Sequence, residues 1–376
     1  MKKLTLISFV LLALSPIAIS AWLLLQKTGT SGREIQEKAY IALEGEGSVS
    51  VINTSTRKVI KSIDLSEVID ARFIGYSAHN IQVSPDGAYV AVTANVMRGT
   101  MGNSSGSSLE DIRDTFQDKI VLIDPLTDTI TASIPTGIDS HLAHVVFDTT
   151  SKMMYVTAQE KGKVYGVNLK EKTIRSIFDL GDTSQPHGVR LTPKGDQLWV
   201  ALIGKKSMAS IDLQTNKITY LPLSGSAIQT AVTPNGQYVF ASVYETKKVA
   251  WTNTQTNKQG YIDLPSDAKG PVQLYPTPDS KYLYVADQGY YFDQPTSNNV
   301  YRIDADTKRV DQTINVGSAP HGVVVDKAGS YVYITNLLSN DVSIIDTQTN
   351  KEVTRIPVGE MPNGISIWNK KLGGTP

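Results

Sequence analysis

Residues 320–329 read Pro-His-Gly-Val-Val-Val-Asp-Lys-Ala-Gly. The chain continues with Tyr-Val-Tyr-Ile-Thr-Asn (331–336), Asp-Val-Ser-Ile-Ile-Asp-Thr (341–347) and Lys-Glu-Val-Thr-Arg-Ile-Pro-Val-Gly (351–359). Each piece is a short run rich in β-branched and aromatic residues, and Gly, Asn, Asp or Pro bounds it. Such runs are typical of β-strands joined by tight turns. This stretch therefore predicts four consecutive antiparallel strands.

The same block recurs along the chain. Alignment on His321 marks one equivalent position in each copy: His79, Ala143, His187, Ile228, Val272, His321 and Asn363. The intervals between these marker positions run from 41 to 49 residues, apart from one of 64. A four-stranded unit with a period of about 40–50 residues is typical of a β-propeller blade. Four aspartates recur at the end of the third strand, where we expect them to cap the next turn: Asp124, Asp212, Asp304 and Asp346.

The two ends of the repeat region are out of phase. Residues 40–65 supply the second, third and fourth strands of a blade, whereas residues 362–368 supply a first strand with nothing after it. Joining them completes a seventh blade and leaves no open sheet edge. We predict an all-β, seven-bladed β-propeller over residues 39–369, closed by pairing of the C-terminal strand with the N-terminal blade. A linker at 27–38 precedes it and a tail at 370–376 follows it.

The chain resembles the YVTN β-propeller repeat family in four blocks: Tyr333-Ile-Thr-Asn336, Tyr155-Val-Thr157, Ser343-Ile-Ile-Asp-Thr347 and Thr215-Asn-Lys217. The resemblance covers residues 39–369, and it extends to the propeller domains of nitrous-oxide reductase and of the d-type haem nitrite reductases. It implies a propeller that works outside the cytoplasm, as in archaeal surface-layer proteins and bacterial periplasmic propellers. It implies little about function, because propellers host many unrelated tasks.

Composition excludes several classes of protein. The 36 Lys and Arg balance the 36 Asp and Glu, whereas a nucleic-acid-binding protein normally carries a basic excess. We therefore expect no nucleic-acid partner. The chain has no cysteine, which excludes disulfides, thiol catalysis, Cys-ligated zinc and iron–sulfur clusters.

The N-terminus predicts export. Lys2 and Lys3 precede an apolar run, residues 4–25, which is long enough to cross about 30 Å of hydrocarbon as a helix. We interpret residues 1–26 as a signal anchor that holds the protein to the membrane, or as a signal peptide cleaved after Ser20. Both interpretations place the propeller in the periplasm or at the cell surface, because the paired lysines keep the N-terminus inside.

All five histidines fall at or beside the marker position. Because the first strand of a blade is innermost in a propeller, their side chains should gather at one mouth of the central channel. Two interpretations stay open: variable polar residues that cap a wet channel, or a ligand cluster for a metal such as copper, which imidazole nitrogens suit. The candidate metal ligands are His79, His141, His144, His187 and His321.

The resemblance also implies a d-type haem as a possible cofactor. His79, His187 and His321 would then bind the haem, and Arg72 and Arg98 would pair with its carboxylates. The resemblance to nitrous-oxide reductase is incomplete, since the chain has too few histidines for the copper cluster of that propeller and no copper-binding cysteine domain.

Two insertions, residues 97–118 and 287–299, should rise beside the histidines, because both connect the second and third strands of a blade. Long loops on a rigid scaffold commonly carry function. We therefore expect a non-catalytic module that binds a small ligand or an extracytoplasmic protein on this looped face. The alternative is a protein that binds copper or a d-type haem and uses it in redox chemistry or in the assembly of a cofactor. A third hypothesis is a hydrolase or lyase that uses a histidine as general base. The sequence shows no set of residues that would act together with such a histidine.

Overall fold

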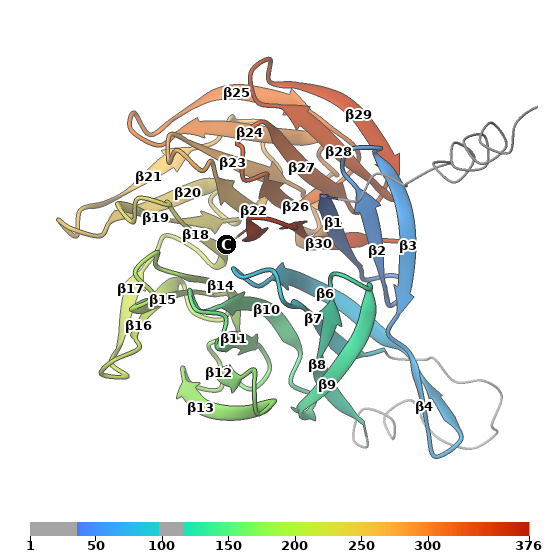
Figure 1. The fold of residues 1–376 in the computed structure, drawn as a ribbon. Helices are drawn as coiled ribbons and strands as arrows, with labels where there is room; N and C mark the ends of the chain where they lie inside the picture. The colour runs from blue at the N-terminus through green and yellow to red at the C-terminus, as the bar shows by residue number, and fades with distance from the viewer. Residues whose placement is uncertain (1–35, 98–115, 376) are drawn as a thin grey trace, which may run out of the picture. The chain divides into compact units, whose positions relative to one another are not determined.

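The protein forms a seven-bladed β-propeller in its computed structural model, which describes residues 36–97 and 116–375. Seven antiparallel sheets of four or five strands stand around a central axis, and each has its first strand near the axis and its last strand at the rim (Figure 1). The strands belong to one compact unit, Glu37–Pro376. The prediction of an all-β, seven-bladed propeller is therefore confirmed.

The blades follow one another in chain order. Blade one comprises β1 (Glu37–Leu43), β2 (Ser48–Asn53), β3 (Lys58–Asp64), β30 (Pro362–Asn369) and β31 (Gly373–Gly374), and a hairpin of β4 (Glu67–Ile69) and β5 (Arg72–Ile74) comes next. Blade two comprises β6 (Tyr76–Val83), β7 (Val90–Val96), β8 (Gln117–Asp124) and β9 (Thr129–Ile138). Blade three comprises β10 (Leu142–Phe147), β11 (Met153–Ala158), β12 (Lys163–Asn168) and β13 (Thr173–Asp179). Blade four comprises β14 (Pro186–Leu191), β15 (Gln197–Leu202), β16 (Ser207–Asp212) and β17 (Ile218–Pro222).

The remaining three blades repeat the pattern. Blade five comprises β18 (Ala227–Val232), β19 (Tyr238–Val243), β20 (Lys248–Asn253) and β21 (Gln259–Asp263). Blade six comprises β22 (Pro271–Pro276), β23 (Tyr282–Asp287), β24 (Asn299–Asp304) and β25 (Arg309–Asn315), with a 3₁₀ turn, η1 (Tyr290–Phe292), in its insertion. Blade seven comprises β26 (Pro320–Val325), β27 (Tyr331–Asn336), β28 (Asp341–Asp346) and β29 (Lys351–Pro357).

Burial along each blade follows from its neighbours. In blade seven, β26 is buried throughout and β27 nearly so, whereas β29 alternates between exposed and partly buried residues. The inner strands lie between two other blades and are apolar on both faces, while the rim strand has one face in water. The predicted turn caps are confirmed: each aspartate accepts a hydrogen bond of 2.8–3.0 Å from the backbone N–H two residues later, for Asp124, Asp212, Asp304 and Asp346.

Blade one contains strands from both ends of the described chain. β30 pairs antiparallel with β1, with Ile367 opposite Ala39 and Ile365 opposite Ile41. The segment expected to be a tail instead continues into β31, which pairs with β30, and β1 begins at Glu37, within the expected linker. The predicted helix and membrane segment of residues 1–26 lie outside the described residues. Within the described part, no helix is long and apolar enough to cross a membrane.

Every inner strand contains a β-bulge beside its marker position. In β14, Pro186 pairs with Leu202 and Val189 pairs with Val200, so His187 and Gly188 together face one residue of β15. A bulge bends the strand and redirects side chains out of the regular alternation. The same register shift occurs in the inner strands of all seven blades, β6, β10, β14, β18, β22, β26 and β30.

Hydroxyl groups link these bulges from blade to blade. Thr157 on β11 accepts a hydrogen bond from the bulged N–H of His144 in its own blade (2.9 Å) and donates one to the carbonyl oxygen of His187 in the next blade (2.6 Å). Three other hydroxyls make the same pair of bonds, those of Thr93, Ser242 and Thr335. The bridge therefore satisfies a backbone donor and a backbone acceptor that lie in the dry interior between blades.

Replacing Thr157 with valine should destabilise the propeller, because the isosteric side chain leaves a buried N–H and a buried carbonyl without partners. We expect a loss of about 2–4 kcal/mol in the free energy of unfolding, measured by denaturant titration. Thr173→Val on the exposed rim strand β13 is the matched control, with an expected change within about 0.5 kcal/mol. Equal stability of the two variants would contradict the bridging role.

Candidate functional site

Three histidines meet at one mouth of the channel. His79 on β6 and His187 on β14 occupy the first bulge position of their strands, and His144 occupies the second bulge position of β10. The ring centroids lie 4.9 Å apart for His144 and His187 and 5.4 Å apart for His79 and His187. One nitrogen from each residue lies within 4.8 Å of the other two, and all three side chains are buried.

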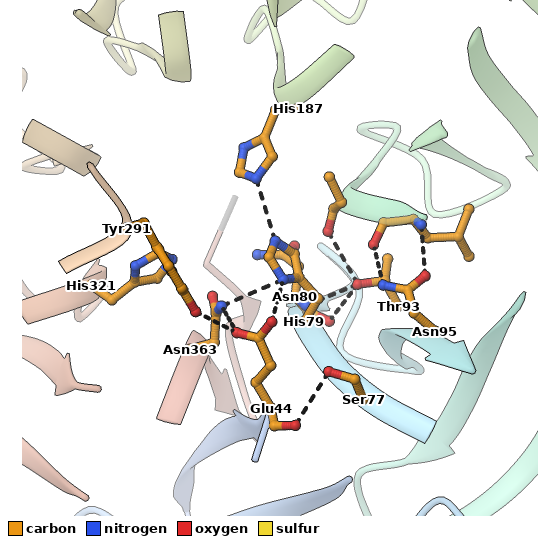
Figure 2. A network of polar contacts seen from close by, with 12 residues as sticks. Glu44, Ser77, His79, Asn80, Thr93, Asn95, His187, Tyr291, His321 and Asn363 are labelled. Atoms are coloured by element: carbon orange, nitrogen blue, oxygen red, sulfur yellow. Dashed lines mark hydrogen bonds and ion pairs between the residues drawn. The ribbon is translucent and has the colours of Figure 1, made fainter. Parts of the chain in front are cut away.

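The Nε2 atoms of His79 and His187 face one another at 3.4 Å (Figure 2). The Nδ1 of His187 lies 2.9 Å from the carbonyl oxygen of Ile228, so this nitrogen carries the proton and Nε2 keeps its lone pair. The Nδ1 of His79 lies 3.4 Å from the carboxylate of Glu44, and the same reasoning leaves its Nε2 with a lone pair. Two facing lone pairs repel each other, and a proton or a metal ion between the nitrogens would relieve this repulsion.

His144 is held by a glutamine from two blades away. The Oε1 of Gln229 accepts the backbone N–H of Thr230 (2.8 Å), so its Nε2 donates to the Nδ1 of His144 (3.1 Å). This arrangement leaves the proton of neutral His144 on Nε2, which is buried without a partner. Gly188 makes room for the glutamine, because a Cβ there would stand 2.0 Å from Oε1.

Glu44 anchors His79 from the turn between β1 and β2. Its carboxylate accepts hydrogen bonds from the amide of Asn363 (2.6 Å) and from the hydroxyl of Tyr291 (2.9 Å), as Figure 2 shows. Burial alone would raise the pKa of Glu44, but the facing His79 and these hydrogen bonds outweigh it and lower the pKa to about 2. Glu44 is therefore a carboxylate throughout the physiological range.

The blade-six insertion reaches this mouth, as the sequence predicted. Tyr291 of η1 bonds Glu44, and its ring meets that of His321 edge-on at 5.7 Å. The Nε2 of Gln288 lies 2.8 Å from the Nδ1 of His321. His321 is therefore held by the insertion and is not one of the three converging histidines. Residues 98–115 of the other insertion lie outside the described residues.

His141 lies at the edge of the cluster, in an acidic hollow. Its ring centroid is 6.0 Å from that of His79, and it lines an open pocket of about 700 Å³ together with Glu44, Asp139 and Glu160. Three carboxylates at the approach to the buried histidines create a negative potential that attracts cations.

The structure does not bring Arg72, one of the two predicted arginines, to the histidines. Arg72 is exposed on β5, whose partner strand β4 stands outside the ring of blades in Figure 1. Its side chain therefore does not serve the channel mouth, because the chain forms an extra hairpin between blades one and two. Arg98 lies outside the described residues.

Burial favours the neutral form of two of the converging imidazoles, His144 and His187. The pKa of His144 falls well below its usual value through burial and the neighbouring His187 and His79, and that of His187 does so through burial and His79. Burial also lowers the pKa of His321, to about 3. Neutral imidazoles are the form that binds metal ions.

Sequence reasoning missed three residues of the candidate site: Glu44, Gln229 and Gln288. Glu44 lies in a connection between the second and third strands of a blade, which is the kind of loop expected on this face, so its position alone could have indicated it. Gln229 follows a marker position directly, and only the bulge makes that second position face the channel. Gln288 directly follows β23, near the start of the blade-six insertion.

Comparison with known proteins supports the fold and leaves the family open. A family model described as Arylesterase matches residues 243–369, about a third of the chain. A search of curated proteins found no match. The resemblance to YVTN repeats stays a prediction.

Solved structures similar to this chain are propellers of varied function. A structure of hydrazine synthase from Kuenenia stuttgartiensis has a TM-score of 0.62 at 18% identity, covering 78% of this chain and 93% of that chain. A catalytically inactive histidine-to-alanine variant of virginiamycin B lyase from Staphylococcus aureus, with quinupristin, has a TM-score of 0.61 at 15% identity, covering 82% and 96%. A putative 6-phosphogluconolactonase from Bacteroides fragilis has a TM-score of 0.63 at 13% identity, covering 90% and 99%. At these identities the likeness concerns the fold alone.

Glu44→Gln should lower stability in a pH-dependent way in metal-free protein. A carboxyl whose pKa is lower in the folded protein stabilises it above the unfolded pKa, near 4.5, and loses this contribution as the pH falls towards about 2. The wild type should exceed the variant by up to about 3 kcal/mol at pH 7, and by progressively less below pH 4.5.

Denaturant titrations between pH 3 and pH 7 measure this difference. Glu171→Gln, in an exposed pair with Arg175, is the control and should change stability by less than about 0.5 kcal/mol. A Glu44 effect that does not vary with pH would contradict the assigned pKa.

Proposed function

We propose that this protein is a propeller that binds a divalent transition-metal ion at the histidine mouth of its channel. His79 and His187 are the principal ligands, and His144 is the third. The observation that carries the proposal is the 3.4 Å separation of the two facing Nε2 atoms. Two nitrogens bound at about 2.0–2.1 Å to one tetrahedral ion stand about 3.3–3.4 Å apart.

The partners of the ligands support the same conclusion. The Nδ1 of His79 faces a carboxylate and that of His187 faces a backbone carbonyl. These are the outer partners that orient metal-bound histidines and leave Nε2 free for the ion. His144 joins the ion when Gln229 turns its carbonyl oxygen towards Nδ1, which moves the proton from Nε2 to Nδ1.

The donor set indicates the kind of ion. Three neutral imidazoles favour Cu²⁺ or Zn²⁺ over the hard cations Mg²⁺ and Ca²⁺, which prefer oxygen ligands. The acidic hollow beside His141 supports the approach of a cation. We do not extend the proposal to a d-type haem, since Arg72 lies away from the site and carboxylates line the hollow. The N-terminal sequence supports a location outside the cytoplasm.

Metal titration of chelator-treated protein by calorimetry tests the proposal. We expect one Cu²⁺ or Zn²⁺ per chain, and a loss of affinity of at least about 100-fold in His79→Ala and in His187→Ala. His321→Ala is the matched control and should stay within about threefold of the wild type, because its imidazole is held by the insertion. Wild-type affinity in both ligand variants would exclude the site.

Gln229→Glu tests the role of His144 separately. One carboxylate oxygen would keep the Thr230 N–H, and the other would accept a proton from the Nδ1 of His144, which frees Nε2 for the ion. The affinity should rise by about 10–100-fold. An unchanged affinity would reduce the site to two histidines.

Hydrolysis at the bound ion is a second candidate function. An ion held by these imidazoles would supply Lewis-acid chemistry suited to ester hydrolysis. The arylesterase match over residues 243–369 also bears on this candidate.

At saturating zinc, phenyl acetate hydrolysis should exceed the metal-free rate, and His187→Ala should lose this gain because it removes a ligand of the ion. Tyr290→Phe, at an exposed ring of the blade-six insertion, is the control with unchanged kcat. A rate equal to that of free zinc would leave the protein as a metal-binding propeller without esterase activity.

A further inference from the structure

The opposite end of the channel contains a second cavity of about 460 Å³. The inner strands run from the histidine mouth to this end, so β14 carries His187 near its start and Arg190 near its end. Three residues of extended strand separate the two by about 10 Å. The cavity is therefore distinct from the candidate metal site.

The walls of this cavity are mostly apolar. They come from the turns between the first and second strands of the blades, where prolines recur, and from the ends of the inner strands. The apolar lining includes Pro85, Phe147, Pro193, Val232, Pro234 and Pro278. A concave apolar site of about 300–1,000 Å³ with a few polar groups is typical of small-molecule binding.

Arg190 supplies a positive charge at this cavity. Its guanidinium donates one hydrogen bond, from Nη1 to the carbonyl oxygen of Val189 (2.9 Å), and among the described residues no carboxylate lies within 4.0 Å of its nitrogens. Burial lowers the pKa of Arg190, but a guanidinium stays protonated in proteins. Most of its five N–H donors are therefore free to bind an anion.

The other charged groups at the cavity are engaged elsewhere. Lys327 donates to the carbonyl oxygen of Leu372. Asp326 accepts the backbone N–H of Ser330 at 2.7 Å, within its own turn, and burial raises its pKa. Neither group compensates Arg190, so the cavity combines an apolar wall with an unmatched cation.

We propose that this cavity binds a small organic acid with an apolar body, whose carboxylate pairs with Arg190. A carboxylate matches the planar guanidinium through two parallel hydrogen bonds, and such a pair gains strength where water is excluded. The hydrocarbon part of the ligand covers the prolines and Phe147. The inference does not depend on the proposed metal site.

Calorimetry with sodium octanoate and with 1-octanol tests the proposal, since the two probes share a chain and differ in charge. The wild type should bind octanoate at least about tenfold more tightly than octanol. Arg190→Met should lose this preference, and Arg175→Met, at an exposed arginine of rim strand β13, should keep it. His187→Ala should also keep it, which separates this result from failure of the metal site.

Arg190→Met should fold, because it removes an uncompensated charge from the interior. Val232→Phe, which fills the cavity and retains Arg190, is a second variant and should weaken both probes. Equal affinity of the wild type for the two probes, or a preference that survives in Arg190→Met, would overturn the proposal.

Discussion

A hydroxyl group shared between two blades organises the inner ring of this propeller. The bulge in each inner strand frees a backbone N–H in a region that water does not reach, and such a group needs a partner. Thr157 supplies that partner and also binds the carbonyl oxygen of His187 in the next blade. The hydroxyl that satisfies the bulge of one blade therefore also fixes the bulge of the next blade. It thereby sets the direction of the side chains that face the axis.

The positions of the histidines at the channel mouth depend on these linked bulges. His79 and His187 are aimed at one another by backbone that cannot shift without breaking buried hydrogen bonds, so their repulsion is not relieved by movement of the strands. Glu44 holds one imidazole with a negative charge, and the carbonyl of Ile228 holds the other. A cation placed between the two nitrogens would satisfy the remaining lone pairs, and the negative approach from the acidic hollow favours its arrival.

The repeat pattern was sufficient to predict the number of blades. It also predicted that the histidines gather, because the first strand of every blade lies nearest the axis. It was insufficient to predict which histidines converge. His144 enters from the second bulge position, although the repeat aligned its neighbour Ala143, and a bulge leaves no mark in periodicity. Arg72 lies on a short exposed hairpin, β4–β5, that has no counterpart in the repeat, so the repeat could not indicate where its side chain lies. Gln229 acts across two blades, a relation that only the closed ring creates.

The bulges also separate the chemistry of the channel from the folding of the blades. Because the hydrogen-bond ladder bypasses the bulged residues, the side chain at that position contributes little to holding its own sheet together. Residues as different as histidine, asparagine, isoleucine and valine already occupy it, at His187, Asn363, Ile228 and Val272. Natural selection or a designer can therefore exchange these side chains almost independently, and one scaffold can acquire new activities at its axis while its blades stay unchanged.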